Sequence, residues 1–182
     1  MKKYEFTGET KQVELWNRTA MLHRIRATVE FGFVKVGELG GWIEKEENLS
    51  HEGKAWVCGD AEVCGDAKVW GNAKVCGDAE VWGNAKVWGN AEVWGNAKVF
   101  SASHVLVIGA IGSRDDFTTF FRDKDNEITV KCGCFLGKID KFLEKVTQTH
   151  GDSKYALVYR AAVEVARLQI DLSGEAPKDA DE

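Results

Sequence analysis

The sequence lacks any long apolar run, since no stretch approaches the roughly 18 residues that a membrane-spanning helix needs. The first residues, MKKYEFTGE, also lack the apolar core of a signal peptide. Proline occurs once, as Pro177, and cysteine five times, an odd number that does not favour a framework of paired disulfides. These scarcities predict a cytoplasmic protein with free thiols and no membrane association.

The chain also lacks a strong excess of charge outside its end. The formal net charge is −5, and residues 171–182 carry one basic and five acidic groups, so this end supplies −4 of it. A nearly neutral body does not suit a general nucleic-acid binder. The acidic composition of residues 172–182 predicts a disordered tail.

What the sequence has in abundance is a six-residue repeat. Between Val57 and Ser101 it reads VCGDAE VCGDAK VWGNAK VCGDAE VWGNAK VWGNAE VWGNAK VFS, without an insertion. Valine opens each unit, and alanine follows four places later. A fixed short period is typical of a solenoid, in which each unit buries its apolar side chains against its neighbours.

The unit itself predicts a short strand and a corner. Ala-Lys/Glu-Val-Trp/Cys alternates, so alanine and valine face inward while the charge and the aromatic ring face outward. Gly-Asn and Gly-Asp follow, and we expect both residues of the pair to turn the chain because both tolerate positive φ. Three strands and three corners would close one triangular coil.

This repeat resembles the hexapeptide-repeat, left-handed β-helix family, and the resemblance implies the handedness and a coil of about 18 residues. We therefore expect a mainly β protein with a short left-handed parallel β-helix of about three coils. The expected organisation is an N-terminal β-rich cap over 1–50, the β-helix over 51–108, and a C-terminal hairpin plus two helices over 109–171. The cap would cover the open edge of the first coil.

Patterns outside the repeat predict further elements. Strands are expected at 3–6 and 21–27, with a turn at 7–9 after the first, and a hairpin is expected from 117–121 and 128–132. Apolar residues at helical spacing predict helices near 138–149 and from Asp152 or Ser153 to about Ile170. The array itself is expected to continue past Ser101, with Val105 in a valine position.

Residues 18 apart should stack into outward columns in such a coil. The aromatic columns contain Trp70, Trp82, Trp88, Trp94 and Phe100, and one charged column pairs Lys74 with Glu92. Aromatic rings on every side of a rod favour burial, so these residues are interface candidates, covered by the terminal segments or by other copies of the chain. Family resemblance favours a homotrimer.

Catalytic and metal chemistry find little support. The Asp and Asn corners could suggest calcium and Cys132-Gly133-Cys134 a metal or redox pair, but corner geometry accounts for the former, and the alternation of a strand predicts the two cysteines as small core or interface residues. Hexapeptide acyltransferases share the solenoid and use a histidine near a loop that leaves it. This array has no such loop, and neither His51 nor His104 has an evident partner. We expect no catalytic residue, no metal and no cofactor.

The C-terminal segment offers a candidate ligand site. Several cationic groups, aromatic rings and a helix N-terminus could gather there, which suits a phosphate-bearing or nucleotide ligand. The candidate residues are Ser113, Arg114, Arg122, His150, Lys154, Tyr159 and Arg160. The alternative is that His150-Gly151-Asp152 merely ends one helix and begins the next, among solvated charges.

The order of segments also resembles small hexapeptide-repeat proteins of bacterial phages and prophages. The resemblance is carried by GELGGWIEKEENLS, the WGNAK-type units, IGSRDDFTTFF, VKCGCFLGKIDKFLEKV and THGDSKYALVYRAAVEVA. It implies an accessory protein in the host bacterial cytoplasm. The leading hypothesis is a non-catalytic anti-defence protein that sequesters a nucleotide-derived host immune signal or occludes a host defence protein. The alternatives are a structural protein-interaction module and an acyltransferase-like enzyme.

Overall fold

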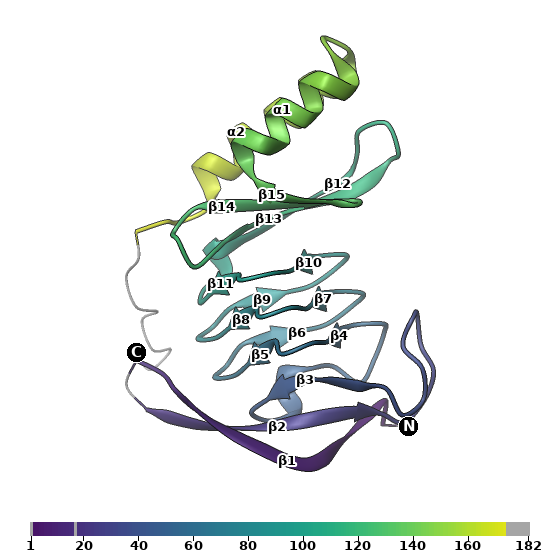
Figure 1. The fold of residues 1–182 in the computed structure, drawn as a ribbon, viewed down its shortest axis with the longest axis vertical. Coiled ribbons are helices and arrows are strands. Elements are labelled where there is room, and N and C mark those ends of the chain that lie inside the picture. Colours follow the sequence, from purple (N-terminus) through teal and green to yellow (C-terminus); the bar gives the residue numbers. More distant parts are fainter. Residues whose placement is uncertain (1, 17, 174–182) are drawn as a thin grey trace.

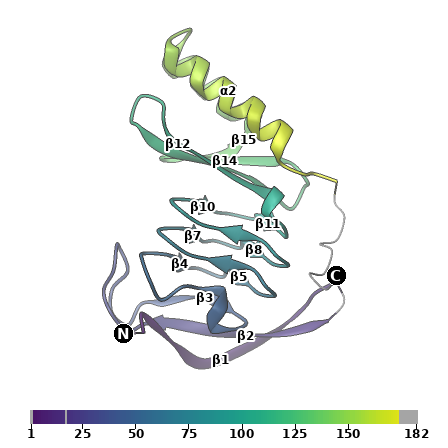
Figure 2. The same ribbon diagram turned by 180° about the vertical axis from the view of Figure 1, so that it is seen from behind.

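The computed structural model describes residues 2–16 and 18–173. A β-solenoid forms the middle, an N-terminal hairpin lies across one end, and an antiparallel sheet carrying two helices covers the other (Figures 1 and 2). The fold class expected from the sequence is therefore confirmed. The expected disordered tail lies outside the described residues from residue 174 on.

Eight two-residue strands build the solenoid. They are β4 Trp56–Val57, β5 Glu62–Val63, β6 Lys68–Val69, β7 Lys74–Val75, β8 Glu80–Val81, β9 Lys86–Val87, β10 Glu92–Val93 and β11 Lys98–Val99. They pair in parallel with a shift of 18 residues, so that Val57, Val75 and Val93 lie in one column. The alanines and valines of the repeat are buried, as the alternation predicted. The three faces are β4-β7-β10, β5-β8-β11 and β6-β9.

The corners differ from the prediction in one respect. Glycine alone takes the positive φ, for example 79° at Gly77, whereas among the described residues the non-glycine positions with positive φ are Asp115 and Asn126, outside the repeat. The Asn or Asp that follows each glycine turns the chain with an ordinary backbone. Each corner thus depends on glycine, which adopts the left-handed backbone conformation at little cost.

The N-terminal segment covers the first coil by extending its sheet. β1 (Tyr4–Glu14) and β2 (Thr19–Ala27) form an antiparallel hairpin, and β3 (Leu39–Ile43) pairs with β2 on one side and in parallel with β5 on the other. The turn expected at residues 7–9 is wrong. A register shift between Phe6 and Thr10 absorbs Gly8, whose φ is 93°, and the strand continues. The solenoid edge is thereby paired rather than exposed.

Four antiparallel strands cover the opposite end. They are β12 Val105–Ile111, β13 Asp116–Arg122, β14 Ile128–Cys132 and β15 Phe135–Lys138. The expected hairpin is confirmed as β13 and β14. The expected continuation of the array is wrong at Val105, which begins β12 and pairs with Phe121 in an antiparallel register.

This sheet separates two hydrophobic cores, because successive side chains of β13 point to opposite faces. Phe121 joins the solenoid core, whereas Phe120 joins a second core between the sheet and the helices. The helices are α1 (Ile139–His150) and α2 (Lys154–Gln169), close to the ranges that the apolar spacing predicted. The β13 strand therefore joins the solenoid to the helical layer.

Candidate functional site

The outward rings stack along the solenoid as their spacing predicted. Trp70 and Trp88 lie nearly parallel, with centroids 6.2 Å apart, and Trp82 stacks on Phe100 at 5.0 Å. Such contacts between neighbouring coils stabilise the stack in addition to burying area.

The chain itself covers one of these columns and leaves another open. Phe100 is only 6% exposed, and Trp16 meets it edge-on with centroids 6.3 Å apart. Side chains from the end of the β1–β2 hairpin pack in the same cluster as Trp82. Trp88, by contrast, is 61% exposed. The terminal segments therefore cover the Trp82–Phe100 column. Cover by these segments, instead of by other copies of the chain, is one of the two arrangements that we expected.

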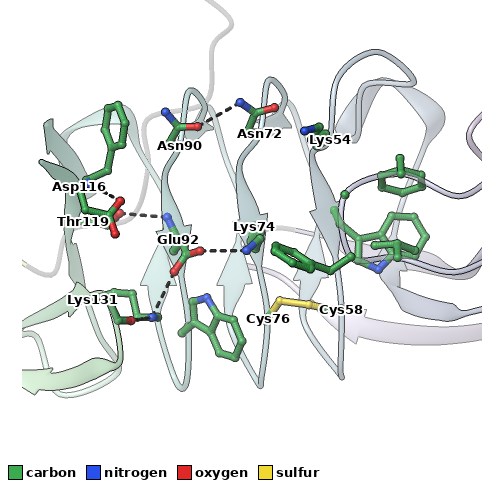
Figure 3. A pocket seen from close by; sticks show the side chains of 18 of the residues that line it. Lys54, Cys58, Asn72, Lys74, Cys76, Asn90, Glu92, Asp116, Thr119 and Lys131 are labelled. Atoms are coloured by element: carbon green, nitrogen blue, oxygen red, sulfur yellow. Dashed lines mark hydrogen bonds and ion pairs between the residues drawn. A yellow bond between two sulfur atoms is a disulfide. The ribbon is translucent and has the colours of Figure 1, made fainter. Parts of the chain in front are cut away.

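The expectation of free thiols is wrong for one pair. Cys58 and Cys76 are joined by a disulfide, because residues 18 apart lie directly above one another and their Cα atoms are 4.6 Å apart. Cys64, Cys132 and Cys134 are free. The disulfide crosses between two coils on the face formed by β4, β7 and β10 (Figure 3).

That same face carries a groove of about 880 Å³. Its floor is the solenoid, one wall is the turn Phe31–Val34 between β2 and β3, and the other is the β13–β14 part of the C-terminal sheet. We call it the lateral groove. It is lined by Phe31, Gly32, Phe33, Val34, Glu38, Lys54, Trp56, Cys58, Asn72, Lys74, Cys76, Asn90, Glu92, Trp94, Asp116, Phe117, Thr119, Lys131 and Gly133.

Glu92 organises the polar part of the lateral groove (Figure 3). Its carboxylate lies 3.0 Å from the Lys74 ammonium and 3.2 Å from that of Lys131, and its backbone N–H donates to Thr119 Oγ1. Glu92 thus ties the solenoid floor to both strands of the wall. The Lys74–Glu92 pair is the charged column that the spacing predicted.

A second polar row runs beside it. The amide of Asn72 donates to Oδ1 of Asn90 at 3.1 Å, and both corner residues line the groove (Figure 3). The unused amide groups of such a row can donate to and accept from a ligand.

At each wall, a side chain of the wall and one of the floor pair an ammonium group with an aromatic ring. Lys74 Nζ lies 5.2 Å from the ring centroid of Phe33, and Lys131 Nζ lies 5.6 Å from that of Trp94. Phe33 is 88% exposed, an unusual degree for a large apolar side chain in a folded protein. Flat rings beside cations form a surface for stacking and for polar contacts at once.

The candidate residues of the C-terminal segment fall into separate places. The hydroxyl of Tyr159 lies 4.0 Å from Cys132 Sγ and so close to Gly112 that a Cβ there would lie 1.9 Å away. Burial and the neighbouring Cys132 raise the pKa of Tyr159, and the charge of Arg114 opposes this. His150 approaches the same ring, with centroids 5.8 Å apart. Ser113 and Arg114 follow Gly112 and are exposed, and the Arg114 guanidinium lies beside Gly133.

The remaining candidates contact other parts of the chain. Arg122 is the last residue of β13 and is 4% exposed. Its guanidinium donates a hydrogen bond to Asn126 and lies 5.3 Å from the ring centroid of Phe100. Arg160 donates to Thr147 and to the carbonyl of Gly151. Lys154 lies over the ring of Tyr155 on its own helix. Of the predicted set, Arg114, His150 and Tyr159 thus lie near one another, whereas Arg122, Lys154 and Arg160 make separate contacts.

Both histidines that could have acted as a general base contact the backbone. His51 stacks on Tyr4 with centroids 4.2 Å apart, and its Nδ1 accepts from the N–H of Lys3. Nδ1 of His104 accepts from the N–H of Phe100 at 3.0 Å. Neither histidine lines the lateral groove.

Three carboxylates also gather in the β13–β14 turn, at Asp123, Asp125 and Glu127. The Lys138 ammonium occupies this cluster, paired with Asp123 and, at 2.6 Å, with Glu127. Burial would raise the pKa of Asp123, but hydrogen bonds from Lys138, Thr129 and two backbone N–H groups lower it overall. A lysine satisfies these charges, so the cluster is a structural ion-pair network.

Sequence reasoning missed the lateral groove because its walls come from segments distant in sequence. The one signal it had was the Lys74–Glu92 column.

In a comparison with known families and proteins, no family model and no curated protein matches the chain. Among the helices of the described residues, none has the length and apolarity to span a membrane.

Proposed function

We propose that this protein is a non-catalytic binding protein whose ligand occupies the lateral groove. The observation that carries the proposal is the pairing of rings with ammonium groups at both walls of one groove, Phe33 with Lys74 and Trp94 with Lys131. A pocket with apolar rings and a few convergent polar groups is the usual form of a small-molecule site.

The chemistry of the groove suits a nucleotide-type ligand. A base can stack on an exposed ring, and a phosphate can replace Glu92 as the partner of Lys74 and Lys131. Lys54 lines the same groove and adds a third cation. Without a ligand, the Glu92 carboxylate neutralises two of these lysines, at distances of 3.0 and 3.2 Å. A phosphate group of the ligand would take its place between them.

The cellular role follows the resemblance to phage-encoded hexapeptide proteins. The Cys58–Cys76 disulfide removes the argument from free thiols, so this resemblance alone supports our proposal that the protein acts in a bacterial cytoplasm, as an anti-defence protein that holds a nucleotide-derived immune signal. The engagement of His51 and His104 by backbone groups supports binding without turnover. The exposed Trp88 supports the alternative of a protein-docking module that occludes a defence protein.

The proposal is tested by calorimetry with a panel of linear and cyclic nucleotides. We expect at least one to bind, and Trp94→Ala to weaken it at least about tenfold through the loss of one stacked base. Trp88→Ala is the matched control, since it removes an outward tryptophan of the same repeat position that does not line the groove.

Two further readouts separate the alternatives. The bound nucleotide should be recovered intact after denaturation; recovery of a product, or turnover of acyl-CoA, overturns the non-catalytic assignment. Equal loss of binding in Trp94→Ala and Trp88→Ala overturns the placement of the ligand. If the whole panel fails to bind, the ligand class is wrong.

A further inference from the structure

Helix α2 has two apolar faces, and only one of them is covered. Ala156, Tyr159, Val163 and Ala166 are buried against α1 and the C-terminal sheet. On a different side of the same helix, Leu168 is 90% exposed, Val165 48% and Val158 39%. A packed helix of a monomer does not need this second face.

Four exposed residues of this face follow a regular spacing, and Leu157, which is 59% exposed, lies beside them. Val158, Ala161, Val165 and Leu168 are separated by three, four and three residues, which is the a/d spacing of a coiled coil. We call these four residues the α2 seam. Its flank carries Arg160, Glu164 and Arg167, and Glu164 is neutralised by Arg167 at 3.2 Å. An apolar seam with a charged border is the form that a helix takes when it pairs with another helix.

We propose that the α2 seam pairs, antiparallel, with the α2 seam of a second copy of this chain. The seam is complementary to itself in one register, in which Val158 meets Leu168 of the second copy and Ala161 meets its Val165. That register joins all four positions, and each layer pairs a smaller side chain with a larger one. A two-fold axis then relates the two copies, which is the commonest symmetry of soluble oligomers.

Charge selects the antiparallel direction. Lys154 begins α2 and is exposed, and Asp171 follows the end of the helix. In the antiparallel pair, Lys154 of each copy lies beside the C-terminal end of the other helix, where free carbonyl groups and Asp171 attract a cation. A parallel pair would bring two Lys154 ammonium groups together.

The first experiment measures mass by sedimentation over a range of concentrations. We expect wild-type protein to form particles with an even number of subunits, and Leu168→Glu to raise the dissociation constant at least about 100-fold, since each copy loses a buried leucine. Leu168 is 90% exposed in the single chain, so this change leaves the fold intact, as circular dichroism would verify. Val36→Glu is the control, an exposed valine outside the seam at 65%.

The second experiment tests direction with single cysteines in a Cys132→Ser, Cys134→Ser background. Val158→Cys mixed with Leu168→Cys should form a disulfide-linked heterodimer under mild oxidation. Val158→Cys alone should not, because the two copies of position 158 lie about 15 Å apart along the pair. A wild-type monomer or trimer, an unchanged mass in Leu168→Glu, or crosslinking of Val158→Cys alone overturns the proposal. None of these outcomes depends on the ligand of the lateral groove.

Discussion

The tight stacking of corner glycines makes a sharp prediction about stability. Gly77 has a φ of 79°, and a Cβ added to it would lie 2.9 Å from the backbone nitrogen of Gly95 in the next coil. Gly89 has a φ of 65°, but a Cβ added to it would meet nothing within 4 Å. The difference arises because Val107, 18 residues after Gly89, belongs to β12 instead of a further coil.

Substituting alanine at Gly77 and at Gly89 separates the cost of the backbone conformation from the cost of overpacking. At Gly89 only the left-handed backbone is penalised, by about 1–2 kcal/mol. At Gly77 the same penalty is joined by overpacking against rigid backbone, about 1–3 kcal/mol more. We therefore expect Gly77→Ala to lower the free energy of unfolding by about 2–5 kcal/mol and Gly89→Ala by about 1–2 kcal/mol.

Urea unfolding followed by tryptophan fluorescence and circular dichroism measures both variants. The comparison is valid if the dependence on urea, the m value, is the same in both, because then the unfolded and folded states expose the same surface. Equal destabilisation by the two substitutions would refute the reasoning, since it would mean that adjacent coils do not pack closely at their corners.

Two further predictions concern buried groups. Burial, and secondly the nearby charge of Arg122, lower the pKa of His104 to about 4. In the unfolded chain the same imidazole takes up a proton near pH 6.5, so the free energy of unfolding should fall as pH drops from about 6.5 toward 4. His104→Asn should remove about 2–3 kcal/mol of that loss, and an unchanged pH profile of unfolding would contradict it. Thiol titration of denatured, unreduced protein should find three free thiols, those of Cys64, Cys132 and Cys134. Reduction of the Cys58–Cys76 disulfide should lower the free energy of unfolding by roughly 2–4 kcal/mol. Five free thiols in the absence of reductant would exclude this disulfide.

The candidate site was predictable only in part. The column Lys74–Glu92 follows from a spacing of 18, because coils repeat without insertions. Phe33 carries no such signal, since it sits in a turn whose position is fixed by the pairing of β3 with β5. Lys131 reaches Glu92 only because β14 lies across the end of the solenoid. The ring-and-ammonium pairs therefore join residues about 40 positions apart in the chain, as with Phe33 and Lys74, a separation that no local pattern encodes.

By itself the sequence determined the solenoid, its inward alanines and valines, the stacking of Trp70 on Trp88, the β13–β14 hairpin and both helices. Each of these follows from a regular spacing, of six residues per repeat or one helical turn, from the 18-residue coil that the resemblance implied, or from two strands joined by a short turn. Tertiary structure alone decided how the solenoid ends. Val105 fits the repeat but leaves it, because Phe121 offers an antiparallel partner and fills the open core. Closing an edge requires contacts between distant segments, and those contacts also create the lateral groove.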